Sequence, residues 1–379
     1  MRATTTIILC LVSWQTQAGA SVPASTPAST PASSGADRPI YVLFTVDVES
    51  TGGGSVQRDI WGRLADEPDD HGIDKMMDIF DRHGVGGTFF VNVYEAPTSG
   101  ADAMAEVCRH IRDRGHDLEL HTHPKPMFGV AYMQQTDLAK QRAILQRGAE
   151  LIKQWTGVDV IAHRAGGYMA NRDTIKACGL AGIPMEFSYN AAWPASALAD
   201  SGLTSNAAFV RDGVLCVPVT SYIQAAAGGW RSMRFLDIEA SSPAEIREVV
   251  GELHRRGVAT AVIMMHSFSF SRFGRPNLRV EAALDELLAG FTADPGVEVL
   301  TARQLYDIWR SRPDAVAGAD FVPYTGWWMT YCRAWQCLGE GWKNAAVAFA
   351  PPAGAVLAAT VVALALWRRR RRRKRKAAA

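Results

Sequence analysis

Two histidines, His121 and His123, stand two positions apart in the run from Asp117 to Pro126. Successive side chains of an extended segment point to opposite faces, so the two imidazoles lie on the same side and can bind one ion or one substrate. Pro124 and Pro126 follow them and indicate a strand that turns into a loop. Neutral imidazole is the commonest protein ligand for zinc, so the spacing predicts a metal or catalytic site. A structural pair of histidines is the alternative.

Polar residues also end three other apolar runs. Asp47 and Glu49 follow the first run, His163 and Arg164 end a later one, and His266 ends a run near the C-terminal third of the chain. Each alone is weak, because an Asp after a strand is often only a turn former. Together, carboxylates, histidines and an arginine at successive strand ends are hard to explain as packing, and they predict a catalytic site.

The elements that would position these residues alternate in type between Arg38 and about residue 315. We predict strands at 41–46, 88–91, 117–123, 158–163, 185–188, 214–219, 259–265 and 297–300, and helices at about 73–83, 101–114, 136–156, 171–179, 243–256, 278–290 and from 302. Strands that alternate with helices imply a parallel sheet. About seven such units predict an α/β fold, a closed or nearly closed (β/α) barrel, with its chemistry at the C-terminal strand ends.

The motifs resemble those of the polysaccharide deacetylases, also called the NodB-homology family or carbohydrate esterase family 4. The family pattern Thr-Phe-Asp-Asp corresponds to Thr45-Val-Asp47-Val-Glu49, and Thr-Phe-Phe-Val corresponds to Thr88 to Val91. The pattern His-Ser/Thr-x-x-His corresponds to His121-Thr-His123-Pro-Lys125. Arg-x-Pro-x-Gly corresponds to Arg164-Ala-Gly-Gly167-Tyr168, and Leu-x-His corresponds to Met264-Met265-His266. Their order and spacing are jointly specific, and they extend over about residues 40–303.

The resemblance implies a deformed barrel that removes N-acetyl or O-acetyl groups from a glycan by metal-assisted hydrolysis. Carried over by position, Asp47 would be the general base and His266 the general acid. Arg164 would orient the base, and a backbone N–H near Gly167 would stabilise the oxyanion. Substrate contacts are expected from Tyr168 and, after a later strand, from Tyr189 and Asn190.

Two departures from the family patterns affect the expected metal ligands. The second family Asp falls on Val48, so the carboxylate ligand would be Glu49. The second ligand His falls on Lys125, so His123 would take its place. A three-ligand set of Glu49, His121 and His123 results, and its two imidazoles favour zinc among divalent metals. A metal-independent site, and one in which Asp47 is the ligand and Glu49 the base, stay open.

The two ends of the chain do not have the composition of a folded domain. We predict a signal peptide at 1–20, a Ser/Thr/Pro/Ala-rich linker at 21–37, a Trp-rich juxtamembrane segment at 316–344, a transmembrane helix at 345–367 and a basic cytoplasmic tail at 368–379 around a catalytic domain at 38–315. The 23 uncharged residues 345–367 are long enough to cross a bilayer, and the basic block would stay on the cytoplasmic side. The catalytic domain would then lie outside, and a C-terminal sorting enzyme is a possible further partner.

Charge argues against a nucleic-acid-binding protein. The chain has 40 Lys and Arg, nine of them in the block at 368–376, which leaves 31 against 38 Asp and Glu. The rest of the chain is therefore mildly acidic, without a basic surface for nucleic acid. The sequence predicts an exported, membrane-anchored enzyme that acts on an acetylated exopolysaccharide or cell-wall polysaccharide. The alternatives are a metal-independent amidase that acts on a small C–N substrate and an inactive carbohydrate-binding protein.

Overall fold

The structure is a computed structural model that describes residues 38–51, 54–198, 203–227, 230–272 and 274–336. The predicted signal peptide, linker, transmembrane helix and basic tail lie outside these residues. Within the described part of the chain, no helix combines the length and apolar character needed to cross a membrane.

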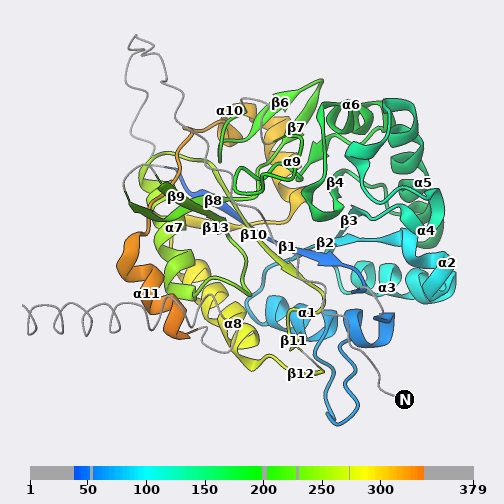
Figure 1. Cartoon of the computed structure of the whole chain (residues 1–379), viewed down its shortest axis with the longest axis horizontal. Coiled ribbons are helices and arrows are strands. Elements are labelled where there is room, and N and C mark those ends of the chain that lie inside the picture. The colour runs from blue at the N-terminus through cyan, green and yellow to red at the C-terminus, as the bar shows by residue number, and fades with distance from the viewer. Residues whose placement is uncertain (1–37, 52–53, 199–202, 228–229, 273, 337–379) are drawn as a thin grey trace, which may run out of the picture. The chain divides into compact units, whose positions relative to one another are not determined.

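A nine-stranded sheet forms the centre of the fold (Figure 1). Its strands are β1 (Ile40–Val48), β2 (Thr88–Val91), β3 (Asp117–Thr122), β4 (Ala162–Ala165), β5 (Met185–Glu186), β6 (Phe209–Arg211), β7 (Val214–Cys216), β10 (Thr260–His266) and β13 (Val297–Val299). They pair in the order β10-β1-β2-β3-β4-β5-β7-β6, and β13 lies beside the first residues of β1. Only β6 runs antiparallel to its neighbour. The curled, mostly parallel sheet is consistent with the predicted deformed (β/α) barrel.

The buried strand β1 lies between two apolar cores. Ile40, Val42 and Phe44 belong to the core that fills the space between the sheet and the helices. Tyr41 and Leu43 belong to a second core with residues of β2, β4, β5, β7, β10 and the helix α9. Because side chains alternate along a strand, a nearly continuous apolar run supplies both cores. This burial explains why the run at 41–46 predicts the central strand.

Helices flank the sheet (Figure 1). They are α1 (Ile73–Arg82), α2 (Ala96–Ser99), α3 (Ala101–Asp113), α4 (Lys125–Phe128), α5 (Leu138–Thr156), α6 (Arg172–Ala181), α7 (Pro243–Arg255), α8 (Leu278–Ala293), α9 (Ala302–Ser311), α10 (Pro313–Val316) and α11 (Gly326–Gln336). Side-chain caps define several starts: Asp137, Asn171, Ser242 and Thr301 accept hydrogen bonds from the first turns of α5, α6, α7 and α9. These caps satisfy backbone N–H groups that have no partner within the helix.

Thr220 connects the two ends of the curled sheet at a place where the strands themselves do not pair. Its N–H donates to the Val262 carbonyl at 3.3 Å, and its Oγ1 accepts from the Val262 N–H at 2.8 Å. The Thr220 carbonyl accepts from the Leu236 N–H at 2.8 Å. Thr220 follows β7, the last parallel strand in the order, and Val262 lies in β10, the first. Thr220 therefore links the segment after β7 to β10. The two ends of the curled sheet are linked here by single hydrogen bonds, and the strand pairing itself stays open.

Some elements differ from the predicted ones. β4 begins at Ala162, four residues after the predicted start, and ends at Ala165. Two hairpins, β8 (Ser221–Ala227) with β9 (Trp230–Phe235) and β11 (Ser271–Arg272) with β12 (Arg275–Pro276), were not predicted. The helix α11 lies within the predicted juxtamembrane segment and packs on β8, where Thr330 Oγ1 donates to the Gln224 carbonyl at 2.8 Å.

Candidate active site

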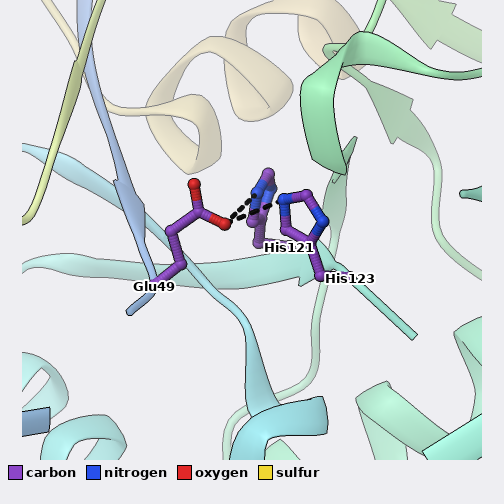
Figure 2. A group of neighbouring side chains, drawn as sticks. All are labelled: Glu49, His121 and His123. Atoms are coloured by element: carbon purple, nitrogen blue, oxygen red, sulfur yellow. Dashed lines mark ion pairs between the residues drawn. The ribbon is translucent and has the colours of Figure 1, made fainter. Parts of the chain in front are cut away.

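The three expected metal ligands converge at the C-terminal ends of β1 and β3, the strands on either side of β2. Figure 2 shows the Glu49 carboxylate next to the imidazoles of His121 and His123, with Oε2 2.8 Å from His123 Nε2 and 3.5 Å from His121 Nε2. One ligand atom from each residue lies within 4.8 Å of the others. Around a four-coordinate zinc with bonds of about 2.1 Å, donor atoms lie roughly 3.4 Å apart. The spacing of the three side chains therefore fits one divalent ion.

His121 gives a second test of whether these residues fit a metal. Its side chain is 1% exposed, and neither ring nitrogen has a hydrogen-bond partner among the described residues. Buried polar atoms are normally paired, so His121 Nε2, which has no hydrogen bond and lies 3.5 Å from the Glu49 carboxylate, is suited to a metal ligand. Burial alone would lower the pKa of His121, but the carboxylates of Asp47 and Glu49 raise it. Burial likewise opposes ionisation of Glu49, yet the two imidazoles hold its pKa well below the ordinary value.

Gly166 makes room for His123. A Cβ atom at position 166 would lie 2.3–2.5 Å from three atoms of the His123 ring. Gly166 stands where the family pattern Arg-x-Pro-x-Gly has proline, and a proline ring would occupy the same space. The departure from the family pattern at His123 and the departure at Gly166 therefore depend on each other, because the His123 ring fits only where position 166 has no side chain.

Asp47 and Arg164 form a buried ion pair beside the ligand cluster. Arg164 Nη1 donates to Asp47 Oδ1 at 2.8 Å, and its Nη2 donates to Thr45 Oγ1 at 2.9 Å. The guanidinium also lies 4.5 Å above the Phe90 ring and is fully buried. A buried charge needs this degree of compensation, so the Asp47 carboxylate has a fixed position. The structure thus brings the expected base and its expected orienting residue into direct contact.

His266 lies directly across from Asp47 in the sheet. The two are register partners of β10 and β1, and His266 Nε2 lies 3.9 Å from Glu49 Oε1. The imidazole stacks on Phe268 with ring centres 4.7 Å apart. The expected acid, base and metal ligands therefore lie within one site.

Glu239 is a site residue that the sequence analysis missed. Its Oε1 lies 3.1 Å from His266 Nδ1 and accepts from Ser269 Oγ at 2.6 Å. Burial would lower the pKa of His266, but this carboxylate, with Asp47 and Glu49, raises it to about 9. The signal in the sequence was Asp237-Ile-Glu239, which repeats the alternation of Asp47-Val-Glu49.

The turn after β4 places Gly167 and Tyr168 at the site. Both have a φ of 59°, in the left-handed region, which is unusual for tyrosine and costs about 1–3 kcal/mol. Tyr168 is 6% exposed, and its hydroxyl has no hydrogen-bond partner among the described residues. A strained residue with a buried, unpaired hydroxyl is typical of a ligand-binding position.

Tyr189 and Asn190 are both buried after β5. The Tyr189 ring packs against Phe209 with ring centres 6.0 Å apart. Asn190 Oδ1 accepts from the Ala192 N–H at 3.0 Å and from Ser221 Oγ at 3.3 Å, while its Nδ2 has no partner among the described residues. These two residues contact β6, β8 and the loop after β5, and not the ligand cluster.

A cavity of about 780 Å³ opens beside the ligands. Glu49 and His123 lie in its wall, together with Lys125, Tyr132 and Phe268. Aromatic faces combined with charged and polar groups are typical of a sugar-binding wall. The cavity is large enough for part of a carbohydrate chain next to the site.

The comparisons with known proteins agree with the motif resemblance. A family model described as "Polysaccharide deacetylase" matches residues 64–185, a range that includes His121, His123 and Arg164. The resemblance to this family is thereby confirmed. A search of curated proteins found no matching sequence.

One solved structure supports the fold, and two further ones match less well. A protein from Mycobacterium smegmatis, provisionally described as a polysaccharide deacetylase, is 21% identical, with a TM-score of 0.52 over 79% of this chain and 98% of its own. A 4-alpha-glucanotransferase from Thermococcus litoralis is 12% identical, with a TM-score of 0.47 over 71% of this chain and 40% of its own. A CE4 family pseudoenzyme from Bacillus anthracis is 13% identical, with a TM-score of 0.40 over 71% and 66%.

Proposed function

We propose, from the chain's resemblance to the polysaccharide deacetylase family, that it is a hydrolase that removes acetyl groups from a polysaccharide. The observation that carries this proposal is the close cluster of Glu49, His121 and His123, with Asp47 and His266 on the adjacent strand ends beside Glu49. A carboxylate base, an imidazole acid and a set of metal ligands are the groups that metal-assisted deacetylation requires.

Glu49, His121 and His123 would hold a divalent metal, and two imidazoles with one carboxylate suit zinc. When bound there, the metal would polarise the acetyl carbonyl and activate water. The buried His121 Nε2, which has no hydrogen bond and faces the Glu49 carboxylate, supports this assignment.

Asp47 would accept the proton of the attacking water. Its contact with Arg164 at 2.8 Å keeps the carboxylate in place and balances its charge within the fold. Arg164 itself is too buried to reach a polymer substrate, so its part is to position the base.

His266 would donate a proton to the leaving amine or hydroxyl. Glu239 at Nδ1 favours the protonated ring, and the other nitrogen, Nε2, is on the side of Glu49. A main-chain N–H near Gly167 would stabilise the negative charge on the acetyl oxygen. The Tyr168 hydroxyl would donate a hydrogen bond to the bound substrate, which would give this buried group a partner.

We also propose that the enzyme works outside the cell and is held at the membrane. Support comes from the sequence, in the short apolar N-terminal run, the 23 uncharged residues at 345–367 and the basic block that follows. An acetylated exopolysaccharide or cell-wall glycan would then be its substrate.

Acetate release from a panel of acetylated glycans tests the activity. We expect the purified protein to release acetate, to stop when a chelator is added, and to resume with zinc. Asp47→Asn and His266→Ala should each lower kcat by about 100-fold or more while the circular dichroism spectrum is unchanged. His110→Ala, on the outer helix α3 where His110 pairs with Asp74, is the matched control.

Other outcomes point to the other functions. Activity that persists in both site variants contradicts the proposal. Hydrolysis of a C–N bond that chelation does not slow favours a metal-independent amidase. Glycan binding without acetate release from any polymer favours a carbohydrate-binding protein.

A further inference from the structure

Two of the three proposed metal ligands lie just beyond the ends of their strands. β1 ends at Val48, one residue before Glu49, and β3 ends at Thr122, one residue before His123. Strand pairing therefore ends before it reaches these two ligands. Metal affinity requires ligand atoms to be held within about 0.5 Å of their places, so something other than the sheet must fix them.

The strand between them supplies a candidate. β2 pairs with β1 on one side and with β3 on the other, and it ends at Val91. The next residue is Asn92, whose N–H donates to the Val48 carbonyl at 2.9 Å. The 3-10 helix η3 (Val93–Glu95) follows and carries Glu95 back toward the same place.

The side chains of Asn92 and Glu95 connect the two ligand segments. Asn92 Oδ1 accepts from the His123 N–H at 3.1 Å, and Asn92 Nδ2 donates to Glu95 Oε1 at 2.9 Å. The same Glu95 oxygen accepts from the Ser50 N–H at 2.8 Å. Ser50 directly follows Glu49. Hydrogen bonds thus run without a break from the backbone of one ligand to the backbone beside the other.

Burial makes this connection stiff. Asn92 is 2% exposed and Glu95 is 8% exposed, so water competes little for these bonds. An amide group is suited to position 92, because it offers an acceptor and a donor in one plane. An aspartate there would still accept from His123, but it would repel the Glu95 carboxylate.

We propose that Asn92 and Glu95 are positioning residues that set the distance between Glu49 and His123 and thereby the affinity of the site for its metal. This inference rests on the proposed function, because it requires a metal at these ligands. Glu95 lies in the wall of the adjacent cavity, so the same connection also joins the ligands to the surface where substrate would lie.

The test measures zinc affinity of the full chain, purified in detergent, by competition with a chromophoric chelator. Asn92→Leu keeps the size of the side chain and removes both of its hydrogen bonds. We expect it to weaken zinc binding by about 10–100-fold, as loss of groups that support metal ligands commonly does. Glu95→Leu should behave in the same way.

Glu95→Gln is the conservative variant. Its amide oxygen can still accept from Ser50 and Asn92, so we expect zinc affinity within about threefold of the unaltered protein. Recovery by glutamine but not by leucine would show that the hydrogen bonds, and not simple bulk, hold the ligands.

Asn171→Leu is the control for general destabilisation. Asn171 caps α6 by accepting from the Thr174 N–H at 3.0 Å and lies in no recorded contact with the ligands. We expect this variant to unfold at a lower temperature without any change in zinc affinity.

Two results would overturn the inference, and they differ. If the unaltered protein binds no divalent metal, both the inference and the metal-dependent function fail. If it binds zinc and Asn92→Leu binds zinc equally well, only the positioning role fails and the proposed function stands.

Discussion

Two ion pairs lie in the candidate site, and they have different effects on its reacting side chains. Asp47 meets Arg164 at 2.8 Å, and His266 meets Glu239 at 3.1 Å. The first pair is fully enclosed and fixes a base in place. The second is partly exposed and acts on a proton, because a neighbouring carboxylate favours the charged imidazole. The base is therefore held inside the fold, while the expected acid lies where solvent and substrate can reach it.

Glu239→Gln should shift the pH dependence of acetate release. Burial lowers the pKa of His266, but the hydrogen bond and the negative charge of Glu239 are the main reasons that the pKa rises to about 9. A glutamine keeps a hydrogen-bond acceptor but removes the charge, so the pKa of His266 should fall. Since the acid form must be protonated, activity should decline at a pH about one unit lower or more. The kcat–pH profile measures this shift.

Glu252→Gln, on the exposed side of α7, is the control and should leave the profile in place. An unchanged alkaline limb in Glu239→Gln would contradict the assignment of His266 as the proton donor.

At the scale of elements, much of the arrangement could be predicted because apolar runs mark buried strands. The runs that became β1, β2 and β10 are nearly continuous and apolar, and the run that became β3 alternates between apolar and polar residues. Polar residues at the ends of β1, β3 and β10 carry the site. The hairpin β8–β9 could not be found in this way, because its burial depends on α11, a helix 100 residues later in the chain. Glu239 was missed for a related reason: its meaning depends on His266, which only the fold brings near.

The contact between the ends of β3 and β4 gives a prediction at this scale. Gly166→Ala would place a Cβ within 2.3–2.5 Å of the His123 ring, so the ring must move away from Glu49. We expect zinc affinity to fall by about 10–100-fold, with little change in thermal stability, because alanine can adopt this backbone. Isothermal titration with zinc and a thermal melt of the same sample measure both.

Gly290→Ala, in α8, is a suitable control, since the nearest atom to its Cβ is Arg247 Cδ at 3.8 Å. It should leave zinc binding unchanged. Equal zinc affinity in Gly166→Ala and the unaltered protein would mean that His123 is not a ligand.

Across the whole molecule, the folded body continues beyond the barrel. Ile223 N–H donates to the Pro323 carbonyl at 2.7 Å, and Arg333 of α11 is 2% exposed, 3.3 Å from Glu245 Oε2 on α7. The family motifs end at about residue 303 and do not predict this helix, because its contacts are not part of the catalytic pattern. The buried pair nonetheless joins the last described helix to the rest of the fold.

Arg333→Met should leave the Glu245 carboxylate buried without its cation. We expect the free energy of unfolding to fall by about 3–5 kcal/mol at neutral pH. Burial raises the pKa of Glu245 and Arg333 opposes that rise, so the substitution raises the pKa further. A raised pKa stabilises the folded state below the ordinary value of 4.5, and this stability is lost as pH rises through the raised value. Urea unfolding should therefore show a smaller loss at pH 5 than at pH 8.

Arg82→Met is the control, because Arg82 pairs with Asp285 at the surface and should contribute less than about 1 kcal/mol. Equal stability of Arg333→Met and the unaltered protein would mean that α11 is not firmly packed.

The packing of α11 limits the distance between the folded body and the uncharged run that begins at Ala345. Only residues 337–344 separate this helix from the uncharged run that begins at Ala345. Eight residues extend at most about 28 Å, at roughly 3.5 Å per residue. If that run spans the membrane as proposed, α11 must remain within this height of the lipid surface. The folded body could then reach only glycan near the membrane, and glycan farther out would keep its acetyl groups.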